Sequence, residues 1–366
     1  MVYGIWSGHR PSAVGRPAEN KANPWSMVHG PWSMVRPSAS GRPSAVRPQA
    51  PRVPSLAYHP PRLYLCALTV NLMPKLQKTL ITTLIAGALL TPFVSEAQNK
   101  TWKPPFVQAE WSKDYRPFRI AGNLYYVGTY DLACYLIATP KGHILINTGL
   151  EGSVPLIRKH VQALGFKFED IKILLATHAH YDHVAGMAAI KKATGAKLMI
   201  QEKDAKAMAD GGASDYALGS HGASFEPVQP DQLLKNGEIV KLGTMQVKLL
   251  HHPGHTPGAS SFSFTVRDQK RAYKVLIANM PSILDETKLS GMPAYPEVGK
   301  DYAKTLAAMK NEQFDIWLSS HASQFSLHEK HKPGDPYHPE AFFDKAGYDK
   351  AVANLKKNYD EKSRQK

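Results

Sequence analysis

Cysteine is nearly absent from the sequence, since its 366 residues include only Cys66 and Cys134. We expect Cys66 to lie in a segment that processing removes or that is never made, which leaves Cys134 without a partner. A framework of intrachain disulfides is therefore excluded. The strand-like neighbours Leu132 and Leu136 predict that Cys134 is a small buried apolar residue.

Glycine-rich phosphate-binding motifs are missing too, because neither a Rossmann nor a P-loop signature occurs. The net charge of +15 nevertheless raises the question of a nucleic-acid partner. Residues 1–97 hold ten basic and two acidic residues, which leaves a net charge of +7 for residues 98–366. The bases there are scattered, so we expect a solvated basic surface and no nucleic-acid partner.

The first 72 residues differ from the rest in being rich in proline, serine and arginine. The run P-W-S-M-V begins at Pro24 and again at Pro31, and the apolar residues show no periodicity. A segment of this composition cannot bury a core. We therefore expect residues 1–72 to be a low-complexity extension without function.

Residues 73–97 have the organisation of a signal peptide that begins at Met73. A short basic stretch precedes the apolar run Leu80–Leu90, and small residues follow up to Ala97. Cleavage after Ala97 would export residues 98–366 to the periplasm as a single domain. An N-terminal membrane anchor is the alternative, but the apolar run is short for a span, so we expect no stable membrane insertion after cleavage.

From residue 98 onward, strand-like and helix-like patterns alternate, which predicts an α/β fold. A loop rich in glycine, serine and proline, 211–231, separates two halves. The first half is expected to contain strands at Leu124–Val127, Cys134–Ala138, His143–Ile146, Ile171–Ala176 and Lys197–Ile200 and helices at Val154–Leu164 and Val184–Thr194. The second half is expected to contain strands at Met245–Leu250, Ser261–Val266, Lys274–Ala278 and Phe314–Leu318, a helix at Tyr302–Asn311 and a C-terminal helix from Pro339.

The stretch T-H-A-H-Y-D-H, residues 177–183, directly follows a predicted buried strand. His178 and His180 are two positions apart and can point to one side, whereas Asp182 and His183 can turn toward a neighbouring point. Imidazole nitrogens and a carboxylate are ligands that zinc accepts. Four ligands could close one structural zinc site, but a catalytic site needs an open position, and two metals need more ligands.

Two later motifs supply additional histidines, each directly after a predicted strand. H-H-P-G-H-T-P-G begins at His251, and its Pro-Gly turn favours His255 as the ligand, while S-S-H-A-S contains His321. Because α/β sheets gather ligands at the carboxyl ends of their strands, we expect these two histidines to join the first cluster. Surface positions are expected for the histidines of the following segment, which is rich in lysine and proline: His328, His331 and His338.

In this order, the three motifs resemble those of the metallo-β-lactamase superfamily and, more narrowly, those of its subclass B3 enzymes of the GOB type. The stretches L-I-A-N-M-P-S (276–282) and D-I-W-L-S-S-H-A-S-Q-F-S-L-H-E-K-H-K-P-G-D-P-Y (315–337) resemble that branch in particular. The likeness covers residues 98–366. It implies an α/β fold in the form of a four-layer αβ/βα sandwich, with a metal cleft at the edge of the two β-sheets.

The resemblance also implies a centre of two zinc ions. The first ion would be held by His178, His180 and His255, and the second by Asp182, His183 and His321. The chain departs from the family pattern at two positions, because GOB-type enzymes commonly carry glutamine at His178 and the superfamily's usual aspartate is Asn147 here. The second departure puts a structural hydrogen bond from that carboxylate in doubt.

By the same resemblance, the protein would be a monomeric β-lactamase that confers antibiotic resistance. A zinc-bound hydroxide would attack the amide bond of penicillins, cephalosporins and carbapenems, since zinc lowers the pKa of bound water to about 7. Asp182 would bind the second zinc and orient the hydroxide, and Ser282 would bind the substrate carboxylate. The loop 211–230, with Tyr216, is expected to flank the cleft.

Other hydrolases of the superfamily are the main alternative, above all lactonases and thioesterases similar to glyoxalase II. These usually carry a further aspartate that bridges both metals, at a strand end between the second and third motifs. The corresponding strand here offers Asn279 and Met280, and neither an amide nor a thioether replaces a bridging carboxylate. A zinc-binding protein without turnover is a third alternative, but nothing in the sequence blocks the cleft.

Overall fold

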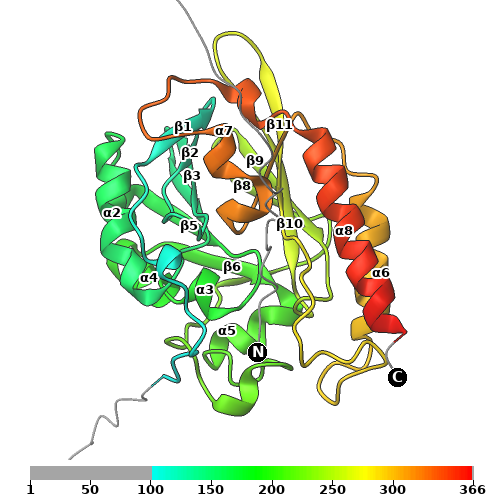
Figure 1. Ribbon diagram of the computed structural model, residues 1–366. Helices are drawn as coiled ribbons and strands as arrows, with labels where there is room; N and C mark the ends of the chain where they lie inside the picture. The colour runs from blue at the N-terminus through cyan, green and yellow to red at the C-terminus, as the bar shows by residue number, and fades with distance from the viewer. Residues whose placement is uncertain (1–100, 365–366) are drawn as a thin grey trace, which may run out of the picture. The chain divides into compact units, whose positions relative to one another are not determined.

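The computed structural model describes residues 101–364, all of which lie in one unit of the chain, Ala97–Lys366. The predicted extension 1–72 and signal peptide 73–97 lie outside the described residues, so both stay predictions. Within the described residues, strands and helices alternate as expected and form two β-sheets, the first of which extends to a short strand just after the loop 211–231 (Figure 1).

The first sheet has seven strands in chain order: β1 (Phe118–Ala121), β2 (Leu124–Tyr126), β3 (Tyr135–Thr139), β4 (Gly142–Ile146), β5 (Ile171–Leu175), β6 (Lys197–Gln201) and β7 (Gln232–Leu234). The α-helices of this half are α2 (Val154–Ala163), α3 (Tyr181–Val184), α4 (Met187–Thr194) and α5 (Ala205–Ala209). Strands β1 to β4 pair antiparallel, whereas β4 to β7 pair parallel. Parallel neighbours need crossover connections, and the three connections here contain α2, α4 and α5.

The second sheet has five strands: β8 (Ile239–Leu242), β9 (Met245–His251), β10 (Ser260–Arg267), β11 (Ala272–Ala278) and β12 (Ile316–Ser319). Its α-helices are α6 (Val298–Met309), α7 (Leu327–Lys330) and α8 (Lys345–Ser363). The order is β12-β11-β10-β9-β8, and only β11 and β12 are parallel, joined by a crossover that contains α6.

The seven-stranded sheet is buried on both faces, because successive strand residues point to opposite sides. Leu136 of β3 belongs to the apolar cluster that contains Ile157 of α2 and Ile190 of α4. The next residue, Ile137, belongs to the cluster that contains Phe262 of β10 in the other sheet. The two sheets therefore pack against each other, and helices cover the outer face of the first.

Helices also cover the outer face of the second sheet. The indole of Trp317 in β12 lies 5.4 Å, centroid to centroid, from the ring of Tyr348 in α8. The Tyr348 hydroxyl donates a hydrogen bond to the carbonyl of Met309 at the end of α6, and the two helices run side by side (Figure 1). This arrangement confirms the predicted αβ/βα sandwich.

Some elements differ from the sequence-based expectation. The helix expected at Val184–Thr194 is divided into α3 and α4, which begins only at Met187. Gly186 separates them, and a β-carbon there would lie 3.0 Å from the carbonyl oxygen of Thr148, so the backbone is closely packed at this point. The strands β1, β7 and β8 were not expected; they have only three or four residues each, and much of β7 is exposed.

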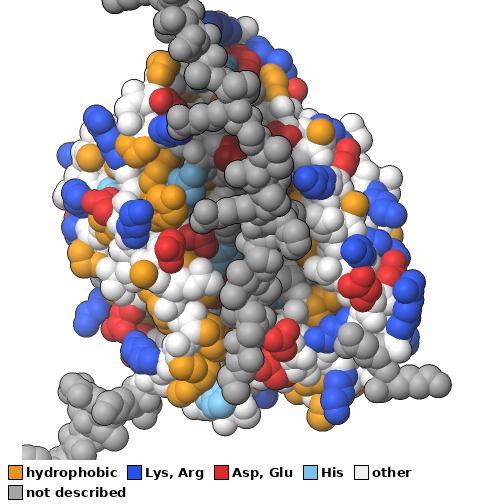
Figure 2. All heavy atoms as spheres, in the orientation of Figure 1, with side chains coloured by type: hydrophobic (Ala, Val, Ile, Leu, Met, Phe, Trp, Pro, Cys, Tyr) orange, Lys and Arg blue, Asp and Glu red, His pale blue; other side chains and the backbone are white. Residues whose placement is uncertain are grey.

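On the face of the described residues that Figure 2 presents, lysine and arginine side chains are interspersed with acidic ones where no grey atoms cover the surface. Between residues 101 and 364, we find no helix with the length and apolar character that a bilayer span requires.

The topology places several strand ends at one edge. β4, β5 and β6 are parallel, so the segments that follow them emerge on the same side of their sheet. In the other sheet, β9 and β11 are both antiparallel to β10, and β12 is parallel to β11, so these three strands also end together. The predicted metal-binding motifs follow β5, β9 and β12.

Candidate metal centre

The loop after β5 and the turn after β9 bring together three histidines, His178, His180 and His255. One ring nitrogen of each lies within 4.8 Å of the others, and all three side chains are buried. The shortest approach is 3.1 Å, between Nδ1 of His180 and Nε2 of His255. This is the first of the two sets that the sequence predicted.

The second predicted set meets around one carboxylate oxygen. Oδ2 of Asp182 lies 3.1 Å from Nε2 of His183 and 3.4 Å from Nε2 of His321. His178 adjoins this set as well, because its ring also groups with Asp182 and His183 as potential ligands within 4.8 Å. The six predicted residues therefore form one continuous cluster.

The local backbone explains how four neighbouring residues reach two points. His180 is extended and caps α3, whose first turn holds Asp182 and His183. The chain thus changes from a loop to a helix between the two pairs, and their side chains diverge. The helix N-terminus also favours the negative charge of Asp182.

The hydrogen bonds around the first set show that it is built for a cation. Nε2 of His180 lies 3.1 Å from Oδ2 of Asp215, and Nδ1 of His255 lies 2.7 Å from the carbonyl oxygen of Ser282. Since both partners are acceptors, these ring nitrogens carry the protons. The facing nitrogens of His180 and His255 then present lone pairs to each other, which requires a proton or a metal ion between them.

A third nitrogen of this set lacks a partner. Nε2 of His178 is buried and makes no hydrogen bond to any described residue. An unpartnered buried polar atom is costly, so a bound cation would relieve it. Buried imidazoles together with a carboxylate are the donor set that zinc prefers, and the residues present therefore fit zinc.

The charges of the cluster are unevenly distributed. Burial holds the pKa of His178 well below its usual value and lowers that of His255 to about 3, so both rings are neutral. Burial also opposes the charged forms of His321 and Asp182, but hydrogen bonds outweigh it. Contacts with Asp131 and Asp182 raise the pKa of His321 to about 9, while His183 and His321 keep the pKa of Asp182 well below its usual value.

Two residues outside the three motifs contact ring nitrogens of the ligand candidates, and the sequence analysis missed both of them. Asp215 contacts His180, and Asp131 contacts Nδ1 of His321 at 3.0 Å. Both carboxylates come from loops without a recognisable motif. No sequence signal pointed to them, because each contact joins segments far apart in the chain.

Asp204 is a further buried carboxylate that the sequence analysis missed. Its oxygens accept hydrogen bonds from the backbone N–H of Ala179 at 2.9 Å, from the hydroxyl of Thr256 at 2.8 Å and from the backbone N–H of Gly258 at 2.6 Å. It therefore ties the T-H-A-H loop to the turn that carries His255. Its position in the sequence could have indicated this role. Asp204 follows the carboxyl end of β6, and β6 lies beside β5, the strand that leads into the first motif.

Asn147 takes the place of the aspartate usual in the superfamily, which had put a structural hydrogen bond in doubt, and its side chain does make hydrogen bonds to the first motif. Its side-chain oxygen accepts hydrogen bonds from both the backbone N–H and the hydroxyl of Thr177, at 3.0 and 3.2 Å. An amide oxygen thus anchors the start of the first motif. Its nitrogen Nδ2 is buried without a hydrogen-bond partner among the described residues.

The remaining candidates lie close to the cluster in different ways. The hydroxyl of Ser282 is 3.4 Å from Nδ1 of His255, and the Ser282 carbonyl also accepts a hydrogen bond from Tyr302. His252 is buried against the hydroxyl of Ser261, and His251 contacts the Pro257 carbonyl, so neither belongs to the cluster, as expected. Cys134 is buried and free, as predicted.

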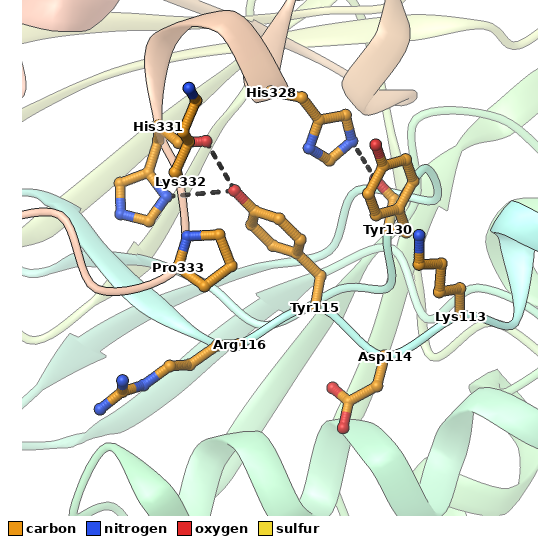
Figure 3. A pocket seen from close by; sticks show the side chains of 9 residues that line it. All are labelled: Lys113, Asp114, Tyr115, Arg116, Tyr130, His328, His331, Lys332 and Pro333. Carbon is orange, nitrogen blue, oxygen red and sulfur yellow. Dashed lines mark hydrogen bonds between the residues drawn. The ribbon is translucent and has the colours of Figure 1, made fainter.

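The expectation of surface positions for the histidines after β12 is wrong for one of them. His331 is buried, its ring stacks on Phe118 at 3.6 Å between centroids, and its Nδ1 lies 3.2 Å from the hydroxyl of Tyr115 (Figure 3). His328 is partly buried, whereas His338 is exposed. Stacking on rings from distant segments overrode the polar composition of this stretch.

The role of Asp204 leads to a test of the scaffold. An Asp204→Ala variant leaves three buried donors without an acceptor, so we expect the free energy of unfolding to fall by about 3 kcal/mol. Asp210→Ala is the matched control, because Asp210 accepts one hydrogen bond from Ser214 and is only partly buried. Urea unfolding measures both, and an equal loss in the two variants would contradict the role of Asp204.

Comparison with known proteins places this geometry in a family. The family model described as "Metallo-beta-lactamase superfamily" matches residues 129–273. A β-lactamase from Chitinophaga pinensis is 61% identical, with a TM-score of 0.71, and the match covers 72% of this chain and 99% of that one. The class B3 di-zinc metallo-β-lactamase LRA-12 from an Alaskan soil metagenome is 57% identical, with a TM-score of 0.70 and the same coverage.

The metallo-β-lactamase GOB-18 from Elizabethkingia meningoseptica is 52% identical, with a TM-score of 0.72 over 73% of this chain and 98% of that one.

Curated relatives are more distant and match over a shorter part. A probable metallo-hydrolase of Methanocaldococcus jannaschii and a hydroxyacylglutathione hydrolase of a Bradyrhizobium species are both 28% identical, over 37% and 36% of this chain. An N-acyl homoserine lactonase of a Bacillus species is 26% identical over 35% of this chain. The chain spans 63%, 42% and 56% of the lengths of these three relatives.

The curated matches are partial and at 26–28% identity, whereas the three solved structures match nearly their whole length at more than half identity. This chain therefore belongs to the metallo-β-lactamase superfamily and, within it, to the class B3 metallo-β-lactamases.

Proposed function

We propose that this protein hydrolyses the amide bond of β-lactam antibiotics with the help of two zinc ions and so confers resistance to them. The observation that carries this proposal is the convergence of His178, His180 and His255, which are buried and each offer a ring nitrogen within 4.8 Å of the other two. The class B3 enzymes at 52–61% identity support the choice of reaction.

The proposed ligand sets are those that the resemblance implied, with His178, His180 and His255 for one ion and Asp182, His183 and His321 for the other. Zinc ions bound there would supply Lewis acidity and a nearby water of lowered pKa. His183 and His321 hold the pKa of Asp182 well below its usual value, so its carboxylate would be charged and could accept a hydrogen bond from such a water. The two sets adjoin, because the ring of His178 also lies within 4.8 Å of the ligand atoms of Asp182 and His183.

Substrate positioning is proposed to involve Ser282. Its carbonyl and hydroxyl both lie against His255, and the carbonyl is also fixed by the Tyr302 hydroxyl. A small rotation of the hydroxyl would turn it from the His255 ring toward a substrate carboxylate. The hydroxyl of Tyr216 contacts that of Thr287 at 3.2 Å, which joins the loop 211–230 to the segment after Ser282.

A lactonase or a thioesterase similar to glyoxalase II is the second candidate, since such relatives match the chain at 26–28% identity. The end of β11 argues against it. Asn279 and Met280 stand where a bridging carboxylate would be needed, and both are buried. We therefore favour the β-lactam amide over lactones and thioesters.

Hydrolysis of nitrocefin and of a carbapenem by the purified zinc-loaded protein tests this proposal. We expect both substrates to be opened and EDTA to abolish the activity, because the reaction requires the bound ions. Homoserine lactones and glutathione thioesters serve as the comparison substrates. Activity that resists EDTA, or that is confined to lactones or thioesters, would contradict the proposal.

The ligand assignment is tested by metal content. His178→Ala is expected to reduce zinc from two ions to one per chain after dialysis, because the first set loses one of its three nitrogens. His338→Ala is the control, since His338 is exposed and outside the cluster. Two ions retained by His178→Ala would refute the assignment.

We further propose that the enzyme works as a monomer in the periplasm, after cleavage of the signal peptide 73–97. A β-lactam must be destroyed before it reaches the cell-wall enzymes, which fits an exported hydrolase. Mass spectrometry of protein recovered from the periplasm is expected to find a chain that begins at Gln98. A mature chain that still contains Leu80–Leu90 would favour a membrane anchor instead.

A further inference from the structure

We propose that Asp131 is a positioning residue for the second metal set and that His328 holds Asp131 in place through the carbonyl of Tyr130. This inference rests on the metal centre of the proposed function. It assigns a role to the segment H-E-K-H, which the ligand motifs leave unexplained. The path from His328 to the metal set passes through His321.

The contact between Asp131 and His321 determines which nitrogen of the imidazole is free. Oδ2 of Asp131 accepts a hydrogen bond from Nδ1 of His321 at 3.0 Å. The other nitrogen, Nε2, then keeps a lone pair and faces Oδ2 of Asp182 at 3.4 Å when the ring is neutral. A carboxylate behind a ligand histidine sets the tautomer and the ring orientation and makes the ring a better donor.

Asp131 can play this part because its carboxylate is itself immobile. The indole N–H of Trp111 donates to Oδ2 at 3.2 Å, and the backbone N–H of Ser323 donates to Oδ1 at 2.9 Å. The backbone N–H of Ala322 also donates to the Asp131 carbonyl at 2.7 Å. These bonds link Asp131 to the turn that carries His321, and the side chain is buried.

The preceding residue, Tyr130, is fixed by the segment after β12. Nε2 of His328 lies 2.8 Å from the Tyr130 carbonyl oxygen and therefore donates to it. The two rings stack with 3.7 Å between centroids, and the ammonium of Lys113 lies 4.1 Å from the Tyr130 centroid (Figure 3). The backbone N–H of Tyr130 donates to the Lys113 carbonyl at 2.8 Å.

These contacts reach Asp131 directly, because the Tyr130 carbonyl belongs to the peptide unit that links the two residues. A hydrogen bond to that carbonyl restricts rotation of the peptide and so the direction in which the Asp131 side chain leaves the backbone. His328 lines an open pocket of about 400 Å³ and is only partly buried. It can therefore be replaced without opening the core between the sheets.

Metal binding, measured on metal-free protein by titration with cobalt(II), tests the inference. We expect Asp131→Asn to weaken the second equivalent at least about tenfold and to change its visible spectrum, while the first equivalent binds as before. His328→Ala should weaken the second equivalent by about threefold, because it loosens Asp131 without removing it. His328→Gln restores a donor near the position of Nε2 and should recover most of the affinity.

The control is His338→Ala, which changes an exposed histidine further along the chain and should alter neither equivalent. Thermal unfolding of each metal-free variant separates loss of positioning from loss of fold. Unchanged second-site affinity in both Asp131→Asn and His328→Ala would overturn the inference, as would an equal loss in His328→Gln and His328→Ala. If Asp131→Asn does not fold, the comparison of the two His328 variants decides alone.

The same titration separates this inference from the proposed reaction. If the wild-type protein binds two equivalents but hydrolyses no β-lactam, the proposed reaction is refuted. The positioning role is then still decided by the difference in metal affinity between the variants. Wild-type protein that binds only one equivalent would overturn the second metal set and the positioning role together.

Discussion

The carboxylate of Asp204 is the contact on which the arrangement of the metal centre depends. It accepts hydrogen bonds from Ala179, between the first two histidines, and from Thr256 and Gly258, which follow His255. Two segments separated by more than seventy residues are thus held at one buried point. Burial raises the pKa of Asp204, so this contact is made at an electrostatic cost that the surrounding fold must offset.

Around that point, the ligand candidates are oriented by partners of different charge. One ring nitrogen of His180 and one of His321 contact carboxylates, whereas Nδ1 of His255 contacts the neutral carbonyl of Ser282. Although burial disfavours the charged ring, Asp215 raises the pKa of His180, while His255 stays neutral. Each set therefore has one imidazole that binds a proton readily, His180 in the first and His321 in the second. A metal ion must displace that proton, whereas the other imidazoles are neutral and can bind a metal directly.

Much of the metal centre was predictable from the sequence, because the strands that lead into the motifs are apolar or alternate between apolar and polar residues, and they occur in the expected order. The three motifs each follow a strand, and the rule that strand ends meet at one edge sufficed to join His178, His255 and His321. The short strands β7 and β8 were not predictable, since three or four partly exposed residues carry no clear period. Nor were Asp131 and Asp215, whose contacts span 190 and 35 residues and depend on loop conformation.

The glycines of H-P-G-H-T-P-G show that a motif can contain residues required for close backbone packing as well as its metal ligand. Gly254 has φ near +135°, and a β-carbon there would lie 2.8 Å from the ring of Tyr302. A β-carbon on Gly258 would lie 2.6 Å from both Cγ and the backbone nitrogen of Asp204. Neither glycine touches a ligand atom. They are required because the backbone of this turn must pass close to α6 on one side and to Asp204 on the other, and only that path delivers His255 to the cluster.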